Sequence, residues 1–476
     1  MKIARLFVAC VASLCTSSPA VAADAAPVTF RLDLLHTGGK GVEIFAVDRL
    51  RQEPLPWPGH PSRAADDGSL GAYRYEVRAA DGTLLQARGY ATIFGEWTST
   101  DEAATLHRTF HESLRFPAPS QAGPVQVTIY KRDAQQAFEP VSQHSIDPTD
   151  MLVDRSASAP QALLALEQHG APADKVDLLL LGDGYTAAEC AAKFRPDAQR
   201  MLAALFKVQP FARRREDFNI WGLCPPAAES GVSRPSTGVH KASPLGATYD
   251  ALRSERYVLS FDNRAVREVA SQAPYEAMVI LVNNETYGGG GIHGLYSTVA
   301  VDSSWADYLF VHEFGHHFAA LADEYYTSPV AYTAPQAIIE PWEPNITALL
   351  DQDRLKWRHL VADGTPLPTP WAKAALEAYQ LDVQARRKQI RADRRPESEM
   401  DALFREEQAH VTRMFARDRY RSVVGAFQGA NYDAKAYYRP QLDCIMFSRD
   451  EVPFCSVCEA AVDRVIDSII PAATRP

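Results

Sequence analysis

The first third of the chain alternates hydrophobic and polar positions with a period of two residues. Segments of this kind, rich in β-branched and aromatic residues and separated by Gly, Pro and Asp turns, lie at residues 28–35, 73–79, 106–116 and 125–130. A period of two places successive side chains on opposite faces of a β-strand. The pattern therefore predicts an N-terminal antiparallel β domain of the sandwich type, over residues 24–145.

The pattern changes near residue 173. Short apolar runs at residues 175–181, 217–223 and 275–282 are separated by helical stretches. Such runs are typical of an α/β sheet that is buried on both faces. The fold class that we expect is therefore multidomain: the β-sandwich-like domain, a linker over residues 146–172, and an α/β domain over residues 173–476.

Two helical features are predicted within the α/β domain. Thr186 and Glu189 have the spacing of a capping box, so a helix should begin just after the first apolar run. Residues 182–184 (Gly-Asp-Gly) are then a tight strand-to-helix turn; phosphate binding is the alternative, although the spacing matches neither common glycine-rich fingerprint. Residues 372–420 are charged, helical in composition and interrupted by Pro396, which predicts a hairpin insertion of two helices.

Residues 1–22 have the composition of a signal peptide. Lys2 and Arg5 precede an apolar run, which ends in the small-x-small pattern Ala20-Val21-Ala22. This run is too short for a membrane span, and no later stretch approaches the roughly 20 apolar residues that a spanning helix needs. We therefore expect a soluble protein that is exported to the periplasm or out of the cell.

Composition and charge narrow the possible partners. With 476 residues, of which 46% are apolar, the chain can bury more than one core. Its formal net charge of −10 becomes −12 when Lys2 and Arg5 leave with the signal peptide. An acidic exported protein without Lys/Arg clusters outside one helical region is not expected to bind nucleic acid.

The stretch WADYLFVHEFGHHFAALA (305–322) carries candidate chemistry on a helix. His312 and His316 are four residues apart, so their side chains project from one face within reach of a single ion. Zinc suits imidazole, and a catalytic zinc site keeps one position for water. Glu313, about 100° around the axis, can take a proton from that water without displacing a ligand. Two histidines and a glutamate in a merely structural apolar helix would be costly, so we predict one catalytic Zn²⁺. His317 faces about 100° away from His316 and is expected either to support a metal ligand or to lie in the core.

The usual continuation to a third ligand is absent. Metzincin peptidases carry a glycine three residues after the second histidine and a His or Asp three residues later, where this chain has Ala319 and Ala322. On a continuous helix, Asp323 would lie about 10 Å beyond the second histidine. For Asp323 to bind the ion, the helix must end near Ala319 or the next residue through a left-handed turn, which costs about 1 to 2 kcal/mol without glycine. Asp323 and Glu324 both remain candidates, with Asp323 favoured.

Several separated motifs occur in an order that is specific to one family. They are IFGEWTSTDEA (93–103), LLGDGYTAAE (180–189), LVNNETYGGGG (281–291), HEFGHHFAALADEYY (312–326), EPWEPNIT (340–347), TPLPTP (365–370) and YYRPQLDCIMFSRDEVPFCSVC (437–458). Together they resemble the IgA-peptidase family of secreted bacterial zinc metallopeptidases, which is metzincin-like. The resemblance covers nearly the whole mature chain. It implies a β-rich accessory domain followed by a metzincin-like peptidase domain with a zinc helix.

The same resemblance implies roles for further residues. It links the late acidic pair to the metal and thereby favours Asp323 as the third ligand. Met446 is the matching position for a methionine turn beneath the ion. A cleft tyrosine often assists the oxyanion in such enzymes, and Tyr437 or Tyr438 is the candidate, of which we choose Tyr438.

The segment before the metal motif suggests a substrate rim. Residues 296–302 alternate and are a candidate edge strand, and the run Gly288–Gly291 lies just upstream. An extended substrate could add to this edge as a strand. The alternative for the glycine run is an ordinary surface loop, and the sequence leaves both open.

Export leaves five cysteines in an oxidising compartment, and an odd number leaves at least one free or paired outside the chain: Cys190, Cys224, Cys444, Cys455 and Cys458. Cys455 and Cys458 form a C-x-x-C motif. A structural zinc would need a fourth ligand, and none is apparent in the sequence. We therefore expect a disulfide from Cys444 to one of the pair.

The function that we expect is an exported zinc endopeptidase that acts, as a monomer, on proteins or glycoproteins. The motifs alone do not identify immunoglobulin A as the substrate. The alternative is that the β domain binds glycan or protein at a surface and the zinc domain is accessory or of the aminopeptidase type. The intact set His312, Glu313 and His316 favours the enzyme, since a binding scaffold has no need of the glutamate.

Overall fold

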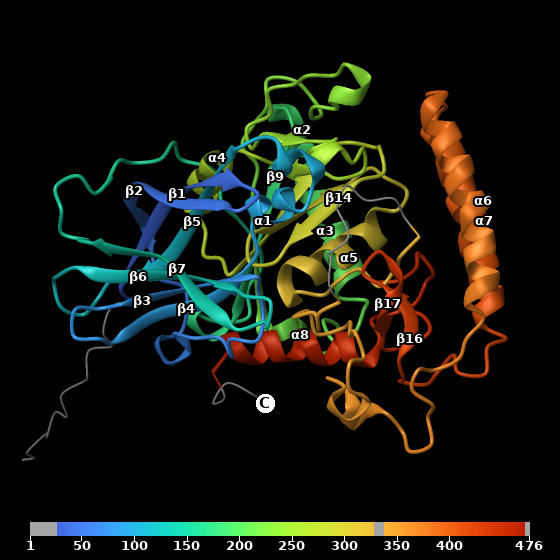
Figure 1. Cartoon of the computed structure of the whole chain (residues 1–476). Helices are drawn as coiled ribbons and strands as arrows, with labels where there is room; N and C mark the ends of the chain where they lie inside the picture. Colours follow the sequence, from blue (N-terminus) through green and yellow to red (C-terminus); the bar gives the residue numbers. More distant parts are fainter. Residues whose placement is uncertain (1–25, 328–337, 472–476) are drawn as a thin grey trace, which may run out of the picture.

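The computed structural model describes residues 26–327 and 338–471 (Figure 1). The predicted signal peptide, residues 1–22, lies outside the described residues. Within the described ranges, no helix is both long and apolar enough to cross a membrane.

The N-terminal domain consists of two antiparallel sheets, as the two-residue period predicted. One sheet has the order β2-β1-β5, with β1 (Val28–Gly39), β2 (Val42–Pro56) and β5 (Arg108–Pro117). The other has the order β4-β3-β6-β7, with β3 (Tyr73–Arg78), β4 (Leu84–Tyr90), β6 (Val125–Arg132) and β7 (Phe138–Ile146). Alternate side chains of both sheets, such as Leu32, Val77 and Val127, form one buried core. The sandwich is therefore held by the strand faces that the sequence marks as apolar.

The second domain contains a mixed sheet of the order β14-β15-β13-β9-β10-β8. Its four inner strands are parallel: β9 (Val176–Asp183), β10 (Phe218–Leu223), β13 (Ala277–Val282) and β15 (Tyr296–Ala300). Its two edge strands are antiparallel to their neighbours: β8 (Leu164–Glu167) and β14 (Gly289–Ile292). This is the α/β arrangement that the continuous apolar runs predicted.

The edge positions differ from the expectation in two ways. The strand at Tyr296–Ala300 is internal, and the edge is the glycine-rich β14, which has no alternating side chains for a periodicity to reveal. β8 lies within the segment 146–172 that was expected to be a linker. A four-residue edge strand is too short to give a clear pattern.

Helices cover both faces of this sheet. On one side Leu178 and Leu180 of β9 pack with α3 (Phe194–Leu205), α5 (Ala306–Ala319) and α8 (Ser456–Ile469). On the other side Leu179 and Leu181 belong to a second core, which contains α4 (Asn263–Ala270) and also α1 (Ile93–Thr98) of the β domain. The β domain therefore contributes apolar residues to the core of the α/β domain.

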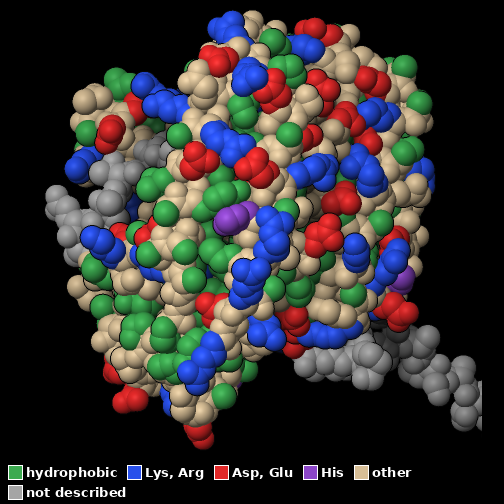
Figure 2. All heavy atoms as spheres, turned by 90° about the vertical axis from the view of Figure 1, so that its right-hand side faces the viewer, with side chains coloured by type: hydrophobic (Ala, Val, Ile, Leu, Met, Phe, Trp, Pro, Cys, Tyr) green, Lys and Arg blue, Asp and Glu red, His purple; other side chains and the backbone are tan. Residues whose placement is uncertain are grey.

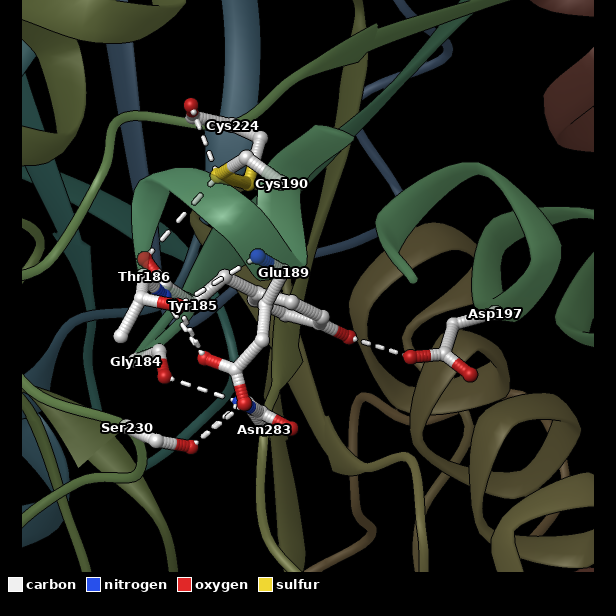
Figure 3. The surroundings of a disulfide bond; sticks show 9 residues. All are labelled: Gly184, Tyr185, Thr186, Glu189, Cys190, Asp197, Cys224, Ser230 and Asn283. Atoms are coloured by element: carbon white, nitrogen blue, oxygen red, sulfur yellow. Dashed lines mark hydrogen bonds between the residues drawn. A yellow bond between two sulfur atoms is a disulfide. The ribbon is translucent and has the colours of Figure 1, made fainter. Parts of the chain in front are cut away.

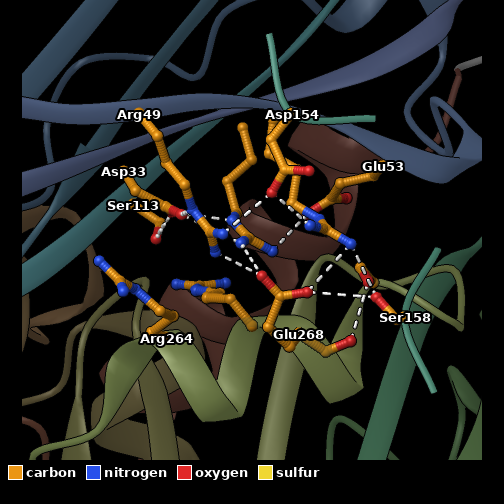
Figure 4. Close-up of polar contacts among 12 residues, drawn as sticks. Asp33, Arg49, Glu53, Ser113, Asp154, Ser158, Arg264 and Glu268 are labelled. Atoms are coloured by element: carbon orange, nitrogen blue, oxygen red, sulfur yellow. Dashed lines mark hydrogen bonds and ion pairs between the residues drawn. The ribbon is translucent and has the colours of Figure 1, made fainter. Parts of the chain in front are cut away.

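Ion pairs reinforce this domain junction (Figure 4). The carboxylate of Glu268, in α4, lies 2.9 Å from Arg31 and 3.1 Å from Arg51, and it also pairs with Arg49. Arg31 is fully buried and also pairs with Asp33 at 2.8 Å, so removal of one acidic partner would weaken the compensation of a buried charge. The polar network and the shared apolar core thus join the two domains into one unit.

The first helix after β9 begins at the predicted capping box (Figure 3). The Thr186 hydroxyl accepts from the backbone N–H of Glu189 (3.3 Å), and the Glu189 carboxylate accepts from that of Thr186 (2.8 Å). The helix is α2 (Ala187–Ala192), and Gly184 before it has φ +76°. Gly182 and Asp183 therefore end strand β9, and Gly184 alone makes the turn to the helix. Cys190 forms a disulfide with Cys224 beyond β10, which ties α2 to the sheet.

The remaining elements lie around the C-terminal half. The two helices α6 (Lys373–Ala392) and α7 (Glu397–Phe415) flank Pro396 and project along one side of the molecule (Figure 1). They lie side by side, since Arg386 pairs with Glu406 at 2.6 Å. On this face, acidic and basic side chains are interspersed (Figure 2). Two small sheets complete the fold: β11 (Ala247–Thr248) with β12 (Leu259–Ser260), and β16 (Phe427–Ala430) with β17 (Asp433–Arg439).

Candidate metal centre

Helix α5 ends where a role for Asp323 requires it to end. Its last residue is Ala319, and Ala320 has the left-handed conformation, with φ 55° and ψ 31°. The backbone N–H groups of Ala320 and Leu321 donate to carbonyl groups one turn earlier, at 3.1 and 3.2 Å. These bonds satisfy carbonyls that a helix end leaves open. The chain then continues as an irregular segment, residues 321–327, which we name the strap.

Three ligand atoms converge beside the helix. The Nε2 atoms of His312 and His316 lie 3.2 Å apart. Oδ1 of Asp323, on the strap, lies 3.1 Å from the first and 3.2 Å from the second. Within the described residues this buried oxygen has no hydrogen-bond partner. A buried, unpartnered carboxylate oxygen that faces two imidazole nitrogens fits a metal ligand, because such an atom would otherwise cost free energy.

Backbone carbonyls fix the orientation of both imidazole rings. Nδ1 of His312 donates to the carbonyl of Ile445 at 3.0 Å, and Nδ1 of His316 donates to that of Leu321. Because a carbonyl can only accept, each Nδ1 carries the proton. Each Nε2 is then the nitrogen that faces Asp323 and that, once it has lost its proton, can bind a metal.

The electrostatic surroundings distinguish the two carboxylates of the site. Burial raises the pKa of Glu313. Burial also opposes ionisation of Asp323, but the two imidazoles outweigh it and hold its pKa well below the usual range. Burial lowers the pKa of His316, yet the nearby Asp323 carboxylate outweighs it and brings the pKa to about 9. Asp323 is therefore the permanent anion, whereas Glu313 is the more basic carboxylate.

Met446 packs directly beneath this helix. It is fully buried, and its Sδ atom lies 3.1 Å from the position that a Cβ on Gly315 would occupy. A larger residue in place of Gly315 would therefore push the helix away from Met446. The carbonyl of Met446 also accepts a hydrogen bond from the backbone N–H of Glu324 at 2.9 Å. The same turn thus contacts both the helix and the strap.

Asn345 also holds the strap, and sequence reasoning did not identify it. Its side-chain amide accepts from the N–H of Ala322 (2.8 Å) and donates to the carbonyl of Ala322 (2.9 Å) and to Oε1 of Glu324 (3.0 Å). Asn345 is fully buried, so these bonds are shielded from water. The only signal in the sequence was its place within the motif EPWEPNIT.

The candidate metal ligands face a cleft of about 520 Å³. One part of its wall comes from β14, and another from Asn431 and Tyr432 in the turn between β16 and β17. Helix α1 of the β domain supplies Gly95 and Glu96, and the Glu96 carboxylate contacts the hydroxyl of Tyr257. Both domains therefore shape the space in front of the ligands.

The glycine run allows β14 to lie directly against the metal helix. A Cβ on Gly291 would lie 2.3 Å from the carbonyl oxygen of Glu313 and 2.8 Å from Cβ of His316. A Cβ on Gly289 would lie 3.3 Å from Oε1 of Glu313. Side chains at these positions would separate the edge strand from the helix. The run is therefore a close-packed edge strand rather than a surface loop.

The cleft tyrosine differs from the one chosen from the sequence. Tyr438 does not line the cleft, whereas Tyr437 and Tyr432 do. The hydroxyl of Tyr432 donates to Oδ2 of Asp323. Side chains alternate along β17, which places Tyr437 and Tyr438 on opposite faces. Tyr432 lies in the preceding turn with φ 59°, and no pattern in the sequence marks it.

His317 lies behind the site in the core. Its Nε2 accepts from the backbone N–H of Met278 and its Nδ1 donates to the carbonyl of Ile292, both at 3.1 Å. Burial lowers the pKa of His317 to about 3. The neutral ring thus connects α5 to two strands of the sheet. His293 contacts the backbone carbonyl of His317 at 3.1 Å and also lines the cleft.

The expected disulfide at Cys444 is not formed. Cys444, Cys455 and Cys458 are all free and buried, and the sulfur atoms of Cys444 and Cys458 lie 3.8 Å apart. That prediction considered the three cysteines only as partners of one another. The fold adds Glu324, whose Oε1 lies 3.3 Å from Sγ of Cys458.

Two family models match the chain. The family described as IgA Peptidase M64 matches residues 164–466. The family described as Peptidase M64 N-terminus matches residues 24–142. No curated protein matches the chain.

Proposed function

The chain belongs to the IgA peptidase M64 family and is a metallopeptidase, and from that premise we propose that it is an exported zinc endopeptidase. One zinc ion is bound by His312, His316 and Asp323. The observation that carries the proposal is the mutual spacing of their ligand atoms, 3.1 to 3.2 Å. Ligands at 2.0 to 2.1 Å from a tetrahedral zinc are about 3.3 to 3.4 Å apart, so only a small adjustment is needed.

Each polar residue of the site has a distinct task. A zinc ion held there supplies Lewis acidity, which polarises a carbonyl and acidifies water. The Glu313 carboxylate takes the proton of the attacking water and passes it to the leaving amine, for which a raised pKa is suitable. The Tyr432 hydroxyl, bound to Oδ2 of Asp323, orients that carboxylate so that Oδ1 faces the histidines.

The substrate backbone adds to the edge of β14. At Gly289 this edge is already paired, because its N–H donates to the carbonyl of Arg256 and its carbonyl accepts from Val258, both at 3.1 Å. Gly291, two residues on, presents its backbone to the same edge and lines the cleft. An extended peptide paired with Gly291 would pass in front of Glu313 and the histidines.

The proposed substrates are proteins or glycoproteins outside the cytoplasm. This rests on the signal-peptide pattern of residues 1–22 and on a cleft that is open to solvent. The hypothesis of an independent binding module has less support, because Gly95 and Glu96 of the β domain form part of the cleft wall. We therefore expect the β domain to contact the same substrate as the metal centre.

A digest of casein and of a peptide library, with and without a chelator, tests the proposal. We expect internal cleavage that disappears with the chelator, returns with zinc and is abolished in Glu313→Ala. The matched control is Asp307→Asn, in the first turn of the same helix, whose side chain is 68% exposed; it should retain activity. Cleavage that persists in Glu313→Ala or in the chelator would refute the proposal. A profile of new terminal amines on host proteins would then identify the substrate.

A further inference from the structure

A second cluster of metal-ligating side chains lies on the far side of the strap from the cleft ligands. Its members come from three places in the chain: Glu324 on the strap, Cys444 before the methionine turn, and Cys455 and Cys458 at the start of α8. One ligand atom from each lies within 4.8 Å of all the others. All four residues are buried, with Glu324, Cys444 and Cys458 fully so.

From this cluster we propose a second metal site, in which the carboxylate of Glu324 and the three thiolates bind a structural zinc ion. The proposal goes beyond the peptidase function and does not depend on it. Soft thiolate ligands with no position left for water are the signature of structural zinc. The cleft site, by contrast, has two imidazoles, one carboxylate and an open side.

The distances fit a tetrahedral ion. Zinc–sulfur bonds of about 2.3 Å in a tetrahedron separate two sulfur atoms by about 3.8 Å, and a sulfur from an oxygen by about 3.6 Å. Sγ of Cys444 and Cys458 are 3.8 Å apart. Oε1 of Glu324 lies 3.3 Å from Sγ of Cys458 and 4.0 Å from Sγ of Cys455. A disulfide needs about 2.0 Å between sulfurs, so the cluster is spaced for coordination.

Backbone N–H groups are directed at the sulfur atoms. The N–H of Cys455 donates to Sγ of Cys444 at 3.2 Å, and that of Cys458 donates to Sγ of Cys455 at 3.5 Å. Such bonds at a helix start stabilise thiolates, the form that binds metal. Asn345 donates to Oε1 of Glu324 at 3.0 Å and orients the carboxylate in the way that outer groups orient metal ligands.

A disulfide would leave this cluster incomplete. Any pairing among three cysteines leaves one thiol over, and it leaves the buried Glu324 carboxylate without a countercharge in the cluster. Within the described residues, Oε2 of Glu324 has no hydrogen-bond partner. Zinc uses all four ligands and offsets two of their four negative charges, and the buried Arg439, which interacts with Glu324 and Cys444, offsets a third.

Metal analysis of the intact protein tests the proposal. We expect two zinc ions per chain in wild type, and one in the double variant His312→Ala/His316→Ala, which removes only the cleft site. The variant Cys455→Ser/Cys458→Ser should fall to one ion, whereas the matched control Cys190→Ser/Cys224→Ser should keep two. Cobalt in the His312→Ala/His316→Ala protein should give a sulfur-to-metal charge-transfer band.

A measurement on wild type avoids variants that fail to fold. Titration with an organomercurial in the presence of a zinc-binding dye should release one zinc as three thiols react. The proposal is overturned if folded wild type holds one ion and the double histidine variant none. It is also overturned if the intact mass without reductant shows a second disulfide. Because the double histidine variant removes the cleft site and leaves the sulfur cluster intact, it tests the second site even if the peptidase proposal fails.

Discussion

The two candidate metal centres lie on opposite sides of one short strap and differ in nearly every physical respect. The cleft centre has nitrogen and oxygen ligands, contacts a cavity of about 520 Å³ and borders the β domain. The cluster around Glu324 is rich in sulfur and buried. Adjacent residues, Asp323 and Glu324, serve the two sides. The two proposals together assign the two consecutive acids of the strap to different ions, Asp323 to the cleft and Glu324 to the sulfur cluster.

The largest effect that separates the two centres is expected from Glu313→Gln. The change removes the proton acceptor but retains the size of the side chain, so kcat/KM should fall about 10²- to 10⁴-fold. Zinc content and the free energy of unfolding should remain as in wild type, since neither ligand set is altered. Peptide cleavage assays and metal analysis of the same samples measure this. Loss of zinc in this variant would mean that Glu313 is a ligand rather than a base.

The disulfide is expected to affect stability without affecting either centre. It links Cys190 and Cys224, 34 residues apart, so its removal should lower the free energy of unfolding by about 3 to 4 kcal/mol through the greater freedom of the unfolded chain. Urea unfolding of Cys190→Ser/Cys224→Ser would show this. If kcat/KM of the folded variant also fell tenfold, the disulfide would be part of the catalytic scaffold.

Asn345→Ala should weaken both centres at once. It removes the amide that holds Ala322 and Glu324, and loss of such an orienting group typically costs 10- to 100-fold in metal affinity. Competition with a chelator should therefore extract both ions more readily. The matched control is Asn219→Ala, equally buried but bonded to Asp177 at the far end of a strand. An effect on one centre alone would show that the strap does not couple them.

The smallest effect that we expect is a pH dependence of stability caused by His36 in the β domain. It should leave both metal centres unchanged. Burial lowers the pKa of His36, but the carboxylates of Glu112 (2.6 Å) and Glu43 (2.9 Å) outweigh it and raise the pKa. This contribution to stability is fully present below the unfolded pKa of about 6.5 and is lost as the pH rises through the folded pKa. The free energy of unfolding of wild type should therefore decrease as the pH rises across this range. This decrease, measured by denaturant unfolding at several pH values, should be absent in His36→Gln. If the decrease persists in His36→Gln, another titrating group is responsible for it.

Local chemistry explains which features could be predicted from the sequence. The strand faces, the capping box at Thr186 and the two histidines follow from periodicity and short-range spacing. The left-handed helix end near Ala320 could be predicted because Asp323 can approach the histidines only if the helix stops before it. The glycine strand β14 carried no periodic signal, and its role emerged only from its contact with Glu313 and His316.

Features that depend on distant parts of the chain were not predictable. The fourth member of the sulfur cluster is Glu324, more than a hundred residues before Cys444, and the sequence gives no means of pairing them. Tyr432 was missed for the same reason, since its contact with Asp323 requires the β16–β17 turn to fold over the strap. The pairing of Cys190 with Cys224 likewise follows from the sheet rather than from cysteine spacing.

The support beneath the metal helix also constrains when the peptidase becomes active. The carbonyls of Ile445 and Met446, which hold His312 and Glu324, lie near the C-terminal end and are synthesised more than a hundred residues after those partners. Contacts between such distant residues form late in folding. A chain shortened before Ile445 would retain His312, His316 and Asp323 but would lack the carbonyl that orients His312, so we expect it to bind the ion more weakly. The geometry of the candidate metal centre thus depends on a segment that lies far from its ligands in the sequence.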